Sequence, residues 1–174
     1  MHIHITGASG SGCTTLAAAL ADDLDLLHLD ADSYYWTPSA PPFQVKRNAT
    51  QRLNLLSNDI ASSRGVVLSG SIVGWGVEIE DLFDLIVFLY LPAPIRVERL
   101  RRRELDKYAR VDQAFLEWAA LYDQGPPEGR SLAKHTAWLS QRRCPVLRLE
   151  ADESVSARLQ QVRAALSDLR PRAV

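Results

Sequence analysis

Short apolar runs alternate with helix-forming segments along the chain, and this alternation is the main structural signal of the sequence. The apolar runs have the length and composition of buried parallel strands, and they lie at residues 1–6, 26–30, 65–69, 84–90 and 145–149. Segments with helical composition or periodicity lie at residues 16–21, about 45–63, from 94 to near 110, about 112–122, 130–141 and 154–169. Residues 30–43 are rich in proline and aromatic side chains, which predicts an irregular loop.

Strands that alternate with helices predict an α/β fold, in which right-handed crossovers place helices on both faces of a parallel sheet. In such sheets, ligands bind beyond the carboxyl ends of the strands. Four of the predicted strands end in or are followed by glycine, aspartate, serine or glutamate, and the strand at 84–90 by a turn at Pro92, so these groups would collect at one edge. We find no linker or internal repeat and expect one domain over residues 1–174.

The first predicted strand leads into a glycine-rich segment with the sequence Gly7-Ala8-Ser9-Gly10-Ser11-Gly12-Cys13-Thr14-Thr15. Its spacing is that of the phosphate-binding P-loop, Gly-x-x-x-x-Gly-Lys-Ser/Thr, except that Cys13 stands in place of the lysine. Glycines free the backbone to point N–H groups at an anion, and the following helix adds the positive end of its dipole. We predict that this segment binds nucleotide phosphates and that the Thr14 hydroxyl binds Mg²⁺. The alternative is a Gly/Ser turn with Thr14 as a helix cap.

The missing lysine raises the question of which group neutralises the terminal phosphates. Losing one such electrostatic contact costs about 3–4 kcal/mol in a typical active site. We expect Arg103 or Lys46 to compensate, together with Mg²⁺ and backbone amides. A thiolate beside phosphates would be repelled, so we interpret Cys13 as a structural residue rather than a nucleophile.

Composition places the chain among ordinary globular proteins, with 47% apolar and 24% charged residues. The net charge of −1 gives no reason to expect a nucleic acid or a membrane as a partner. The two cysteines, Cys13 and Cys144, have no spacing typical of zinc sites or disulfides. With no signal peptide and no apolar run long enough for a membrane span, we expect a cytoplasmic protein.

Several further motifs resemble those of small P-loop kinases, the broad family of adenylate, shikimate and gluconate kinases. The resemblance is closer to a group of bacterial adenylate-kinase-like P-loop proteins that also lack the loop lysine. It is carried by the glycine loop and by Asp30, Asp32, Tyr35, Trp36, Pro41, Pro42, Phe43, Lys46, Arg47, Ser69-Gly70-Ser71, Gly74-Trp75-Gly76 and residues 115–123. It implies a three-layer fold with the strand order 2-3-1-4-5, and ATP and Mg²⁺ as cofactors.

The resemblance also assigns roles to the two aspartates after the second strand. It implies that Asp30 lies on the metal side with Thr14, and that Asp32 binds the acceptor or takes its proton. Phosphoryl transfer needs mainly positioning and charge neutralisation, so one carboxylate suffices as base. The alternative is that both aspartates cap backbone amides at a turn.

Residues 96–110 hold seven basic and three acidic side chains. Helical spacing predicts that Arg96, Arg99 and Arg103 share one face. The resemblance implies that Arg99 stacks on the adenine, that Arg103 reaches the phosphates and that Arg110 belongs to the lid. The lid, at about residues 104–112, is shorter than the family pattern. The alternative is a solvated basic surface.

Lys46 and Arg47 are expected to open the helix at about residues 45–63, where the resemblance implies that they hold an anionic acceptor. Trp36, Phe43 and Trp75 are expected either to line the acceptor pocket or to form local core. A surface pair is the alternative for Lys46 and Arg47.

Together these features favour an ATP- and Mg²⁺-dependent kinase whose acceptor is a small molecule or a nucleoside monophosphate. Because Cys13 replaces the lysine and the lid is short, a non-catalytic nucleotide-binding module is the alternative hypothesis. A simple NTPase ranks last, since no glutamine that would position water is evident.

Overall fold

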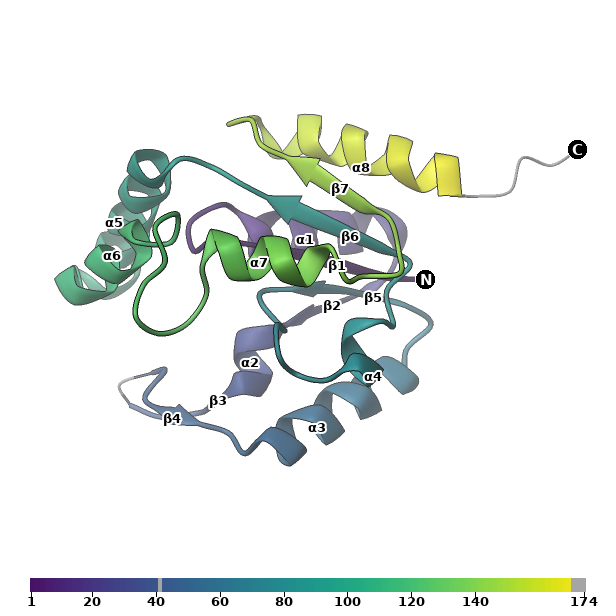
Figure 1. Cartoon of the computed structure of the whole chain (residues 1–174), viewed down its shortest axis with the longest axis horizontal. Helices are drawn as coiled ribbons and strands as arrows, with labels where there is room; N and C mark the ends of the chain where they lie inside the picture. Colours follow the sequence, from purple (N-terminus) through teal and green to yellow (C-terminus); the bar gives the residue numbers. More distant parts are fainter. Residues whose placement is uncertain (41, 170–174) are drawn as a thin grey trace, which may run out of the picture.

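The computed structural model describes residues 1–40 and 42–169, so Pro41 of the family resemblance lies outside the described residues. Its centre is a five-stranded parallel sheet (Figure 1). The strands are β1 (His2–Gly7), β2 (Leu27–Asp30), β5 (Val66–Ser69), β6 (Leu85–Leu89) and β7 (Val146–Leu149). They lie in the order β2-β5-β1-β6-β7, with every pair of neighbours parallel. Counted along the chain this is 2-3-1-4-5, so the predicted α/β P-loop fold is confirmed.

Helices cover both faces of the sheet and thereby bury it (Figure 1). On one face lie α1 (Cys13–Leu24) and α8 (Val155–Leu169). On the other lie α3 (Ala49–Ala61), α4 (Val77–Glu80) and α7 (Leu132–Leu139). The long helix α5 (Ala93–Tyr108) packs against α6 (Gln113–Ala120) at one end of the molecule.

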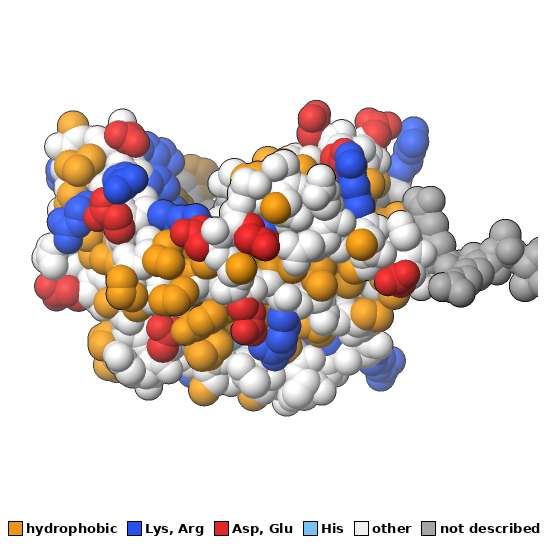
Figure 2. Space-filling model, turned by 90° about the horizontal axis from the view of Figure 1, so that it is seen from above, with side chains coloured by type: hydrophobic (Ala, Val, Ile, Leu, Met, Phe, Trp, Pro, Cys, Tyr) orange, Lys and Arg blue, Asp and Glu red, His pale blue; other side chains and the backbone are white. Residues whose placement is uncertain are grey.

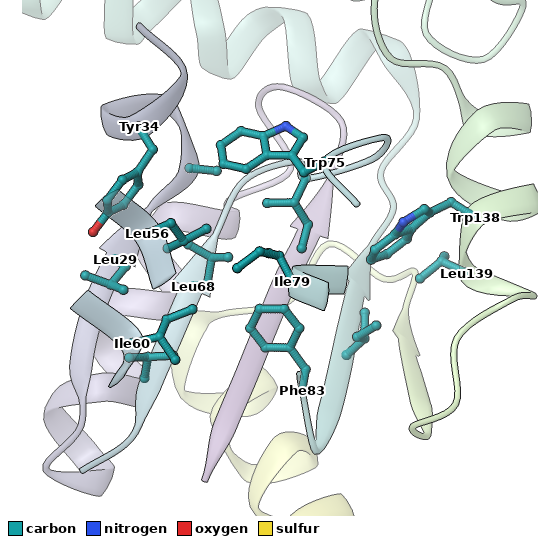
Figure 3. Packing of buried hydrophobic residues seen from close by; sticks show 14 of the residues in the cluster. Leu29, Tyr34, Leu56, Ile60, Leu68, Trp75, Ile79, Phe83, Trp138 and Leu139 are labelled. Atoms are coloured by element: carbon teal, nitrogen blue, oxygen red, sulfur yellow. The ribbon is translucent and has the colours of Figure 1, made fainter. Parts of the chain in front are cut away.

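Side chains of the central strands alternate between the two faces, as the twofold period of a strand requires. In β6, Ile86 and Phe88 join the cluster with α3, α4 and α7, whereas Val87 and Leu89 join the cluster with α1 and α8. Figure 3 shows the first cluster, in which the labelled apolar side chains of several helices and β5 converge. Because both faces are buried, the strands read in the sequence as continuous apolar runs.

A histidine of β1 lies inside this core. His4 is fully buried, and its Nε2 lies 2.9 Å from the Gly70 carbonyl oxygen. Its ring packs against Phe83 and Trp138. Burial lowers the pKa of His4 to about 4, so the ring is neutral and Nε2–H donates to the carbonyl.

The predicted loop at residues 30–43 contains regular structure, which corrects the sequence analysis. It starts with the short helix α2 (Ala31–Tyr35), followed by β3 (Trp36–Thr37). Strand β3 pairs antiparallel with β4 (Val45–Lys46), so the third helix begins at Ala49 rather than near residue 45. The Asn48 side chain accepts hydrogen bonds from the N–H groups of Thr50 and Gln51, which fixes this start.

The segment expected to form a lid, about residues 104–112, begins as the last part of α5. The helix continues through Tyr108, and Ala109 adopts a left-handed conformation with φ 52° that ends it. The Asp112 side chain then caps α6 by accepting from the Phe115 N–H. Across the described part of the chain, every helix is too short or too polar to span a lipid bilayer.

Candidate functional site

The glycine loop between β1 and α1 folds into a tight turn at the carboxyl edge of the sheet. The N–H and the hydroxyl of Ser11 both donate to the Ala8 carbonyl, at 3.1 and 2.7 Å. Gly10 has φ 84°, and a Cβ there would lie 2.5 Å from the Arg96 carbonyl oxygen. Within the described residues, α1 has no side-chain cap at its N-terminus. Its first N–H groups are therefore free to bind an anion.

The two residues predicted to bind the metal ion lie next to each other. The Thr14 hydroxyl donates to the Asp30 carboxylate, with 3.1 Å between Oγ1 and Oδ2. The other carboxylate oxygen of Asp30 accepts from the Asp32 N–H at 3.0 Å and so caps α2. Asp30 thus caps a backbone amide, which was the alternative in the sequence analysis, and its place on the metal side with Thr14 stays a prediction. A hydroxyl and a carboxylate oxygen are ligands that suit Mg²⁺.

Asp32 lies one residue inside α2 and faces two cations. Its Oδ1 lies 3.8 Å from Nη2 of Arg130, and its side chain is about half exposed, at 48%. Burial raises the pKa of Asp32 above its usual range, and the charge of Asp30 adds to this, whereas Arg130 and Arg103 oppose it. A carboxylate with a raised pKa is a better proton acceptor for catalysis near neutral pH.

Arg130 was not predicted as a site residue. It lies directly before α7, whose start is capped by the Ser131 side chain that accepts from the Lys134 N–H. The sequence does contain one signal for it: Arg130 lies between Gly129 and a capping serine, a pattern typical of a loop that enters a helix. Its charge acts on Asp32, on Cys13 and on the buried His135.

Cys13 occupies the place of the loop lysine at the start of α1. Its thiol lies 3.3 Å from the Ser11 hydroxyl. Burial raises the pKa of Cys13 to about 11, against the opposing effects of Ser11, Arg130 and Arg158. The thiol therefore stays protonated at neutral pH and is not a nucleophile. The two arginines that act on it come from α8 and from the loop before α7.

A buried hydrogen-bonded chain leads away from the end of β5. The Ser71 hydroxyl lies 3.1 Å from Nε2 of His135, and Nδ1 of the same ring lies 2.7 Å from the Tyr122 hydroxyl. Burial, assisted by the charge of Arg130, lowers the pKa of His135 to about 3. The neutral ring therefore fixes Ser71, in the predicted Ser69-Gly70-Ser71 motif, relative to α7.

The predicted base-binding residue Arg99 lies at a surface depression. Its side chain pairs with Asp152, which follows β7. The depression has a volume of about 410 Å³ and is lined by Pro94, Ile95, Glu98, Arg99, Arg102 and Asp152. In the view from above, Lys and Arg side chains gather at the end of the molecule formed by α5 and α6, beside a hollow (Figure 2). The position suits a nucleotide base, since Gly12 of the loop is also close to Arg99.

Other arginines of α5 have different surroundings, which corrects the predicted shared face. Arg96 is fully buried and donates to the carbonyls of Leu91 and Ala119, while it pairs with Asp123 at 3.3 Å. Arg103 is exposed and its charge reaches Asp32. Arg110 is exposed beyond the end of α5.

The residues predicted to bind the acceptor lie around the β3–β4 hairpin. Lys46 is exposed on β4 and does not open a helix as expected. Arg47 donates to the carbonyls of Tyr34 and Trp36, at 3.0 and 3.2 Å, and so holds the hairpin against α2.

Of the three aromatic residues of that predicted pocket, two contact each other and the third lies in the core. Trp36 is half-buried and contacts Phe43 edge to face. Trp75 is buried, 5% exposed, and lies under Arg52 with 4.6 Å from the guanidinium to the ring. Trp75 therefore belongs to the core, which was the alternative expectation.

No model of a known protein family matches the chain. The chain is 44% identical over 176 residues to a protein of Bacillus subtilis (strain 168) described as uncharacterized protein YqaC, and the match covers 95% of this chain and 97% of that protein. It is 30% identical over 115 residues to a cytidylate kinase of Natronomonas pharaonis, over 60% of this chain and 59% of that enzyme.

Among solved structures, the fold is similar to that of a shikimate kinase from Bacteroides thetaiotaomicron. The TM-score is 0.59 at 20% identity, and the match covers 96% of this chain and 98% of the other. At this identity the similarity shows the fold. The chain therefore has the fold of small P-loop kinases.

Proposed function

The chain belongs to the protein family of Bacillus subtilis YqaC, and we propose that it is a kinase that transfers the γ-phosphate of ATP to a small hydroxylated acceptor. Small metabolites that carry a hydroxyl and a negative charge are the acceptors with the best-matched chemistry. A nucleoside monophosphate, the other candidate, would accept the group on a phosphate oxygen, which is already ionised and needs no base. The fold shared with a shikimate kinase and the partial similarity to a cytidylate kinase support this class of reaction.

The observation that carries the proposal is the double hydrogen bond of Asp30. One of its carboxylate oxygens accepts from Thr14 of the loop, and the other accepts from the N–H of Asp32. A single side chain thus connects the part of the loop that would meet the phosphates with the residue proposed as base. Positioning of this kind supplies most of the catalysis in phosphoryl transfer.

In the proposed reaction, Asp32 accepts the proton of the acceptor hydroxyl as its oxygen forms a bond to the γ-phosphorus. The bond from that phosphorus to the β–γ bridging oxygen breaks, and its electron pair leaves with ADP. Arg103 is proposed to neutralise the transferred group and Arg110 to close over it, while Arg99 stacks on the base. Thr14 and Asp30 would hold Mg²⁺, whose charge neutralises phosphate oxygens when it is bound.

The acceptor is proposed to be an anion because Arg130 stands next to Asp32. A guanidinium binds a carboxylate or phosphate through two parallel hydrogen bonds, which would turn the acceptor hydroxyl toward the base. Trp36, Lys46 and Arg47 lie at the other, C-terminal end of this short helix, with Lys46 exposed on β4. We therefore propose a molecule that carries both a hydroxyl and a negative charge.

The test is transfer of labelled γ-phosphate from ATP with Mg²⁺ to a panel of nucleoside monophosphates, sugar acids and hydroxy acids. In Asp32→Asn, we expect kcat to fall by about 10²- to 10⁴-fold, as general-base catalysis contributes this much. The ATP dissociation constant should stay within about threefold, because Asp32 faces the acceptor. Asp22→Asn, an exposed carboxylate on α1, is the matched control with unchanged kcat.

Two results would contradict the proposal. ATP binding without transfer to any acceptor would favour the non-catalytic nucleotide-binding module that Cys13 suggests. Full activity of Asp32→Asn would remove Asp32 as the base and leave the kinase assignment standing.

A further inference from the structure

Arg158 is a buried cation that contacts the glycine loop from α8. It is 3% exposed, and its Nη1 donates to the Ser11 carbonyl at 3.0 Å. Its Nη2 donates to the Ala151 carbonyl at 2.9 Å, and Nε is buried without a partner in the described structure. The side chain therefore reaches the loop from the opposite side to Asp30 and Asp32.

No carboxylate of the described residues forms an ion pair with Arg158. The nearby Asp152 pairs with Arg99 instead. Burial, and next to it the charge of Arg99, lower the pKa of Arg158, while the charges of Asp152 and Glu153 oppose this. A buried guanidinium without a counter-ion is costly, and the cost falls when an anion binds beside it.

The place where such an anion would bind is defined by Gly12. Nη1 of Arg158 lies 3.3 Å from the position of a Cβ on Gly12, and Nη1 of Arg99 lies 3.8 Å from it. Gly12 has φ 97° and precedes α1, whose first N–H groups have no side-chain cap in the described structure. The same charge acts on the Cys13 thiol, at the position where the lysine of the motif would start.

We propose that Arg158 takes over the electrostatic task of the missing loop lysine, by placing a positive charge beside the phosphates bound at Gly12 and by fixing the Ser11–Gly12 peptide. This inference rests on the proposed function, since it needs a nucleotide in the loop. Donation to the Ser11 carbonyl also polarises the Gly12 N–H of the same peptide, which strengthens it as a donor to phosphate.

If Arg158 were only a brace, that is, a residue that holds the loop by hydrogen bonds to the Ser11 and Ala151 carbonyls, it would make the same contacts. The test must therefore separate the effect of its charge from that of its hydrogen bonds. Arg158→Gln keeps two N–H donors and removes the charge, whereas Arg158→Lys keeps the charge. The double variant Cys13→Lys with Arg158→Gln returns a charge from the usual position of the motif. Arg163→Met, on the same helix but paired with Asp23 away from the loop, is the matched control.

The experiment measures the dissociation constants of ATP and of inorganic tripolyphosphate by calorimetry, both with Mg²⁺. We expect Arg158→Gln to weaken both by about 10- to 100-fold, as a charge-assisted hydrogen bond does. Arg158→Lys should stay within about fivefold of the wild type, and the double variant should recover at least tenfold over Arg158→Gln. Arg163→Met should bind like the wild type.

The outcomes distinguish this inference from the proposed function. If the wild type binds neither ATP nor tripolyphosphate, the proposed function fails and the inference with it. If the wild type binds both and Arg158→Gln and Arg158→Lys are weakened equally, Arg158 is only a brace and the inference alone is overturned. Circular dichroism of each variant confirms that the comparison is between folded proteins. If Arg158→Gln is poorly folded, Arg158→Lys decides the matter: binding within about fivefold of the wild type supports the inference, and a larger loss overturns it.

Discussion

Arg96 and Arg158 are both buried in the described structure, and their surroundings differ. Arg96, at the joint of α5 and α6, pairs with Asp123, donates to two carbonyls and lies 5.1 Å from the Tyr122 ring centre. Arg158, between α8 and the glycine loop, has two carbonyl partners and, within the described residues, no paired carboxylate. Both are buried, but within the described residues only Arg96 of the two forms an ion pair with a carboxylate.

The difference shows how a buried charge can be interpreted. When a buried guanidinium forms an ion pair with a carboxylate of the same protein, we expect its removal to lower the free energy of unfolding. When it forms no such pair, an anion from solution can bind beside it, and we expect its removal to weaken the binding of that anion. The glycine loop contacts both arginines, since Gly10 packs on the Arg96 backbone and the Ser11 carbonyl accepts a hydrogen bond from Arg158.

The largest expected effect concerns the stability of the Arg96 region. Arg96→Met should lower the free energy of unfolding by about 3–5 kcal/mol, because it leaves Asp123 and two carbonyls without their partner. Urea unfolding followed by circular dichroism measures this. The dissociation constant for tripolyphosphate, corrected for the folded fraction, should stay within about threefold of the wild type.

The opposite result would contradict this distinction between Arg96 and Arg158. A stable Arg96→Met protein with weakened phosphate binding would make Arg96 the cation of the site and Arg158 a structural residue.

A smaller effect on the free energy of unfolding is expected from pH, through His135, which contacts the same Tyr122 ring as Arg96. The pKa of His135 is lowered to about 3 in the folded protein, from an ordinary value of 6.5. Below pH 6.5 the unfolded chain takes up a proton that the folded chain does not, so stability falls as the pH falls. His135 alone contributes a slope of about 1.4 kcal/mol per pH unit between pH 6 and 4.

This contribution can be isolated with His135→Gln, which keeps hydrogen-bonding groups but does not titrate. Its unfolding free energy, measured in urea at several pH values, should depend less steeply on pH than that of the wild type, by the slope given above. Equal slopes would mean that His135 is already protonated in the folded protein at these pH values.

The smallest effect is expected at an exposed arginine of the same helix as Arg96. Arg102 pairs with Glu98 one turn away at 2.7 Å, with both side chains at least half exposed. Arg102→Ala should change the free energy of unfolding by less than about 0.5 kcal/mol, since solvent screens such pairs. A loss of several kcal/mol in the same urea experiment would show that exposure does not separate the arginines of α5.

The sequence pattern was sufficient for the sheet and its large helices because both faces of the sheet are buried. Each central strand is a run of apolar side chains, and the P-loop spacing fixed the place of α1. The β3–β4 hairpin was missed because its strands have only two residues each and depend on Arg47 donating to Tyr34 and Trp36. Such a contact depends on tertiary structure, which no local propensity encodes.

The residues of the candidate site could be predicted from the sequence where a local motif contains them. Thr14, Asp30 and Asp32 were found from strand ends and the loop, and the structure brings them together. Arg130 and Arg158 approach from elements far along the chain, so spacing could not reveal them. One signal was present for Arg158: it occupies the buried stripe of α8 with Val162 and Leu166, at spacings of four residues.

The contact between Gly10 and the Arg96 carbonyl also limits how the chain can change its length. Residues 90–92 connect β6 to α5, and one inserted residue would turn the start of α5 by about 100°. The carbonyl that now seats Gly10 would then face elsewhere, and a side chain would be permitted where only hydrogen fits at present. We therefore expect an insertion or deletion in this short connection to disturb the contact of Gly10 with Arg96, although the connection contains no residue of the phosphate-binding motif.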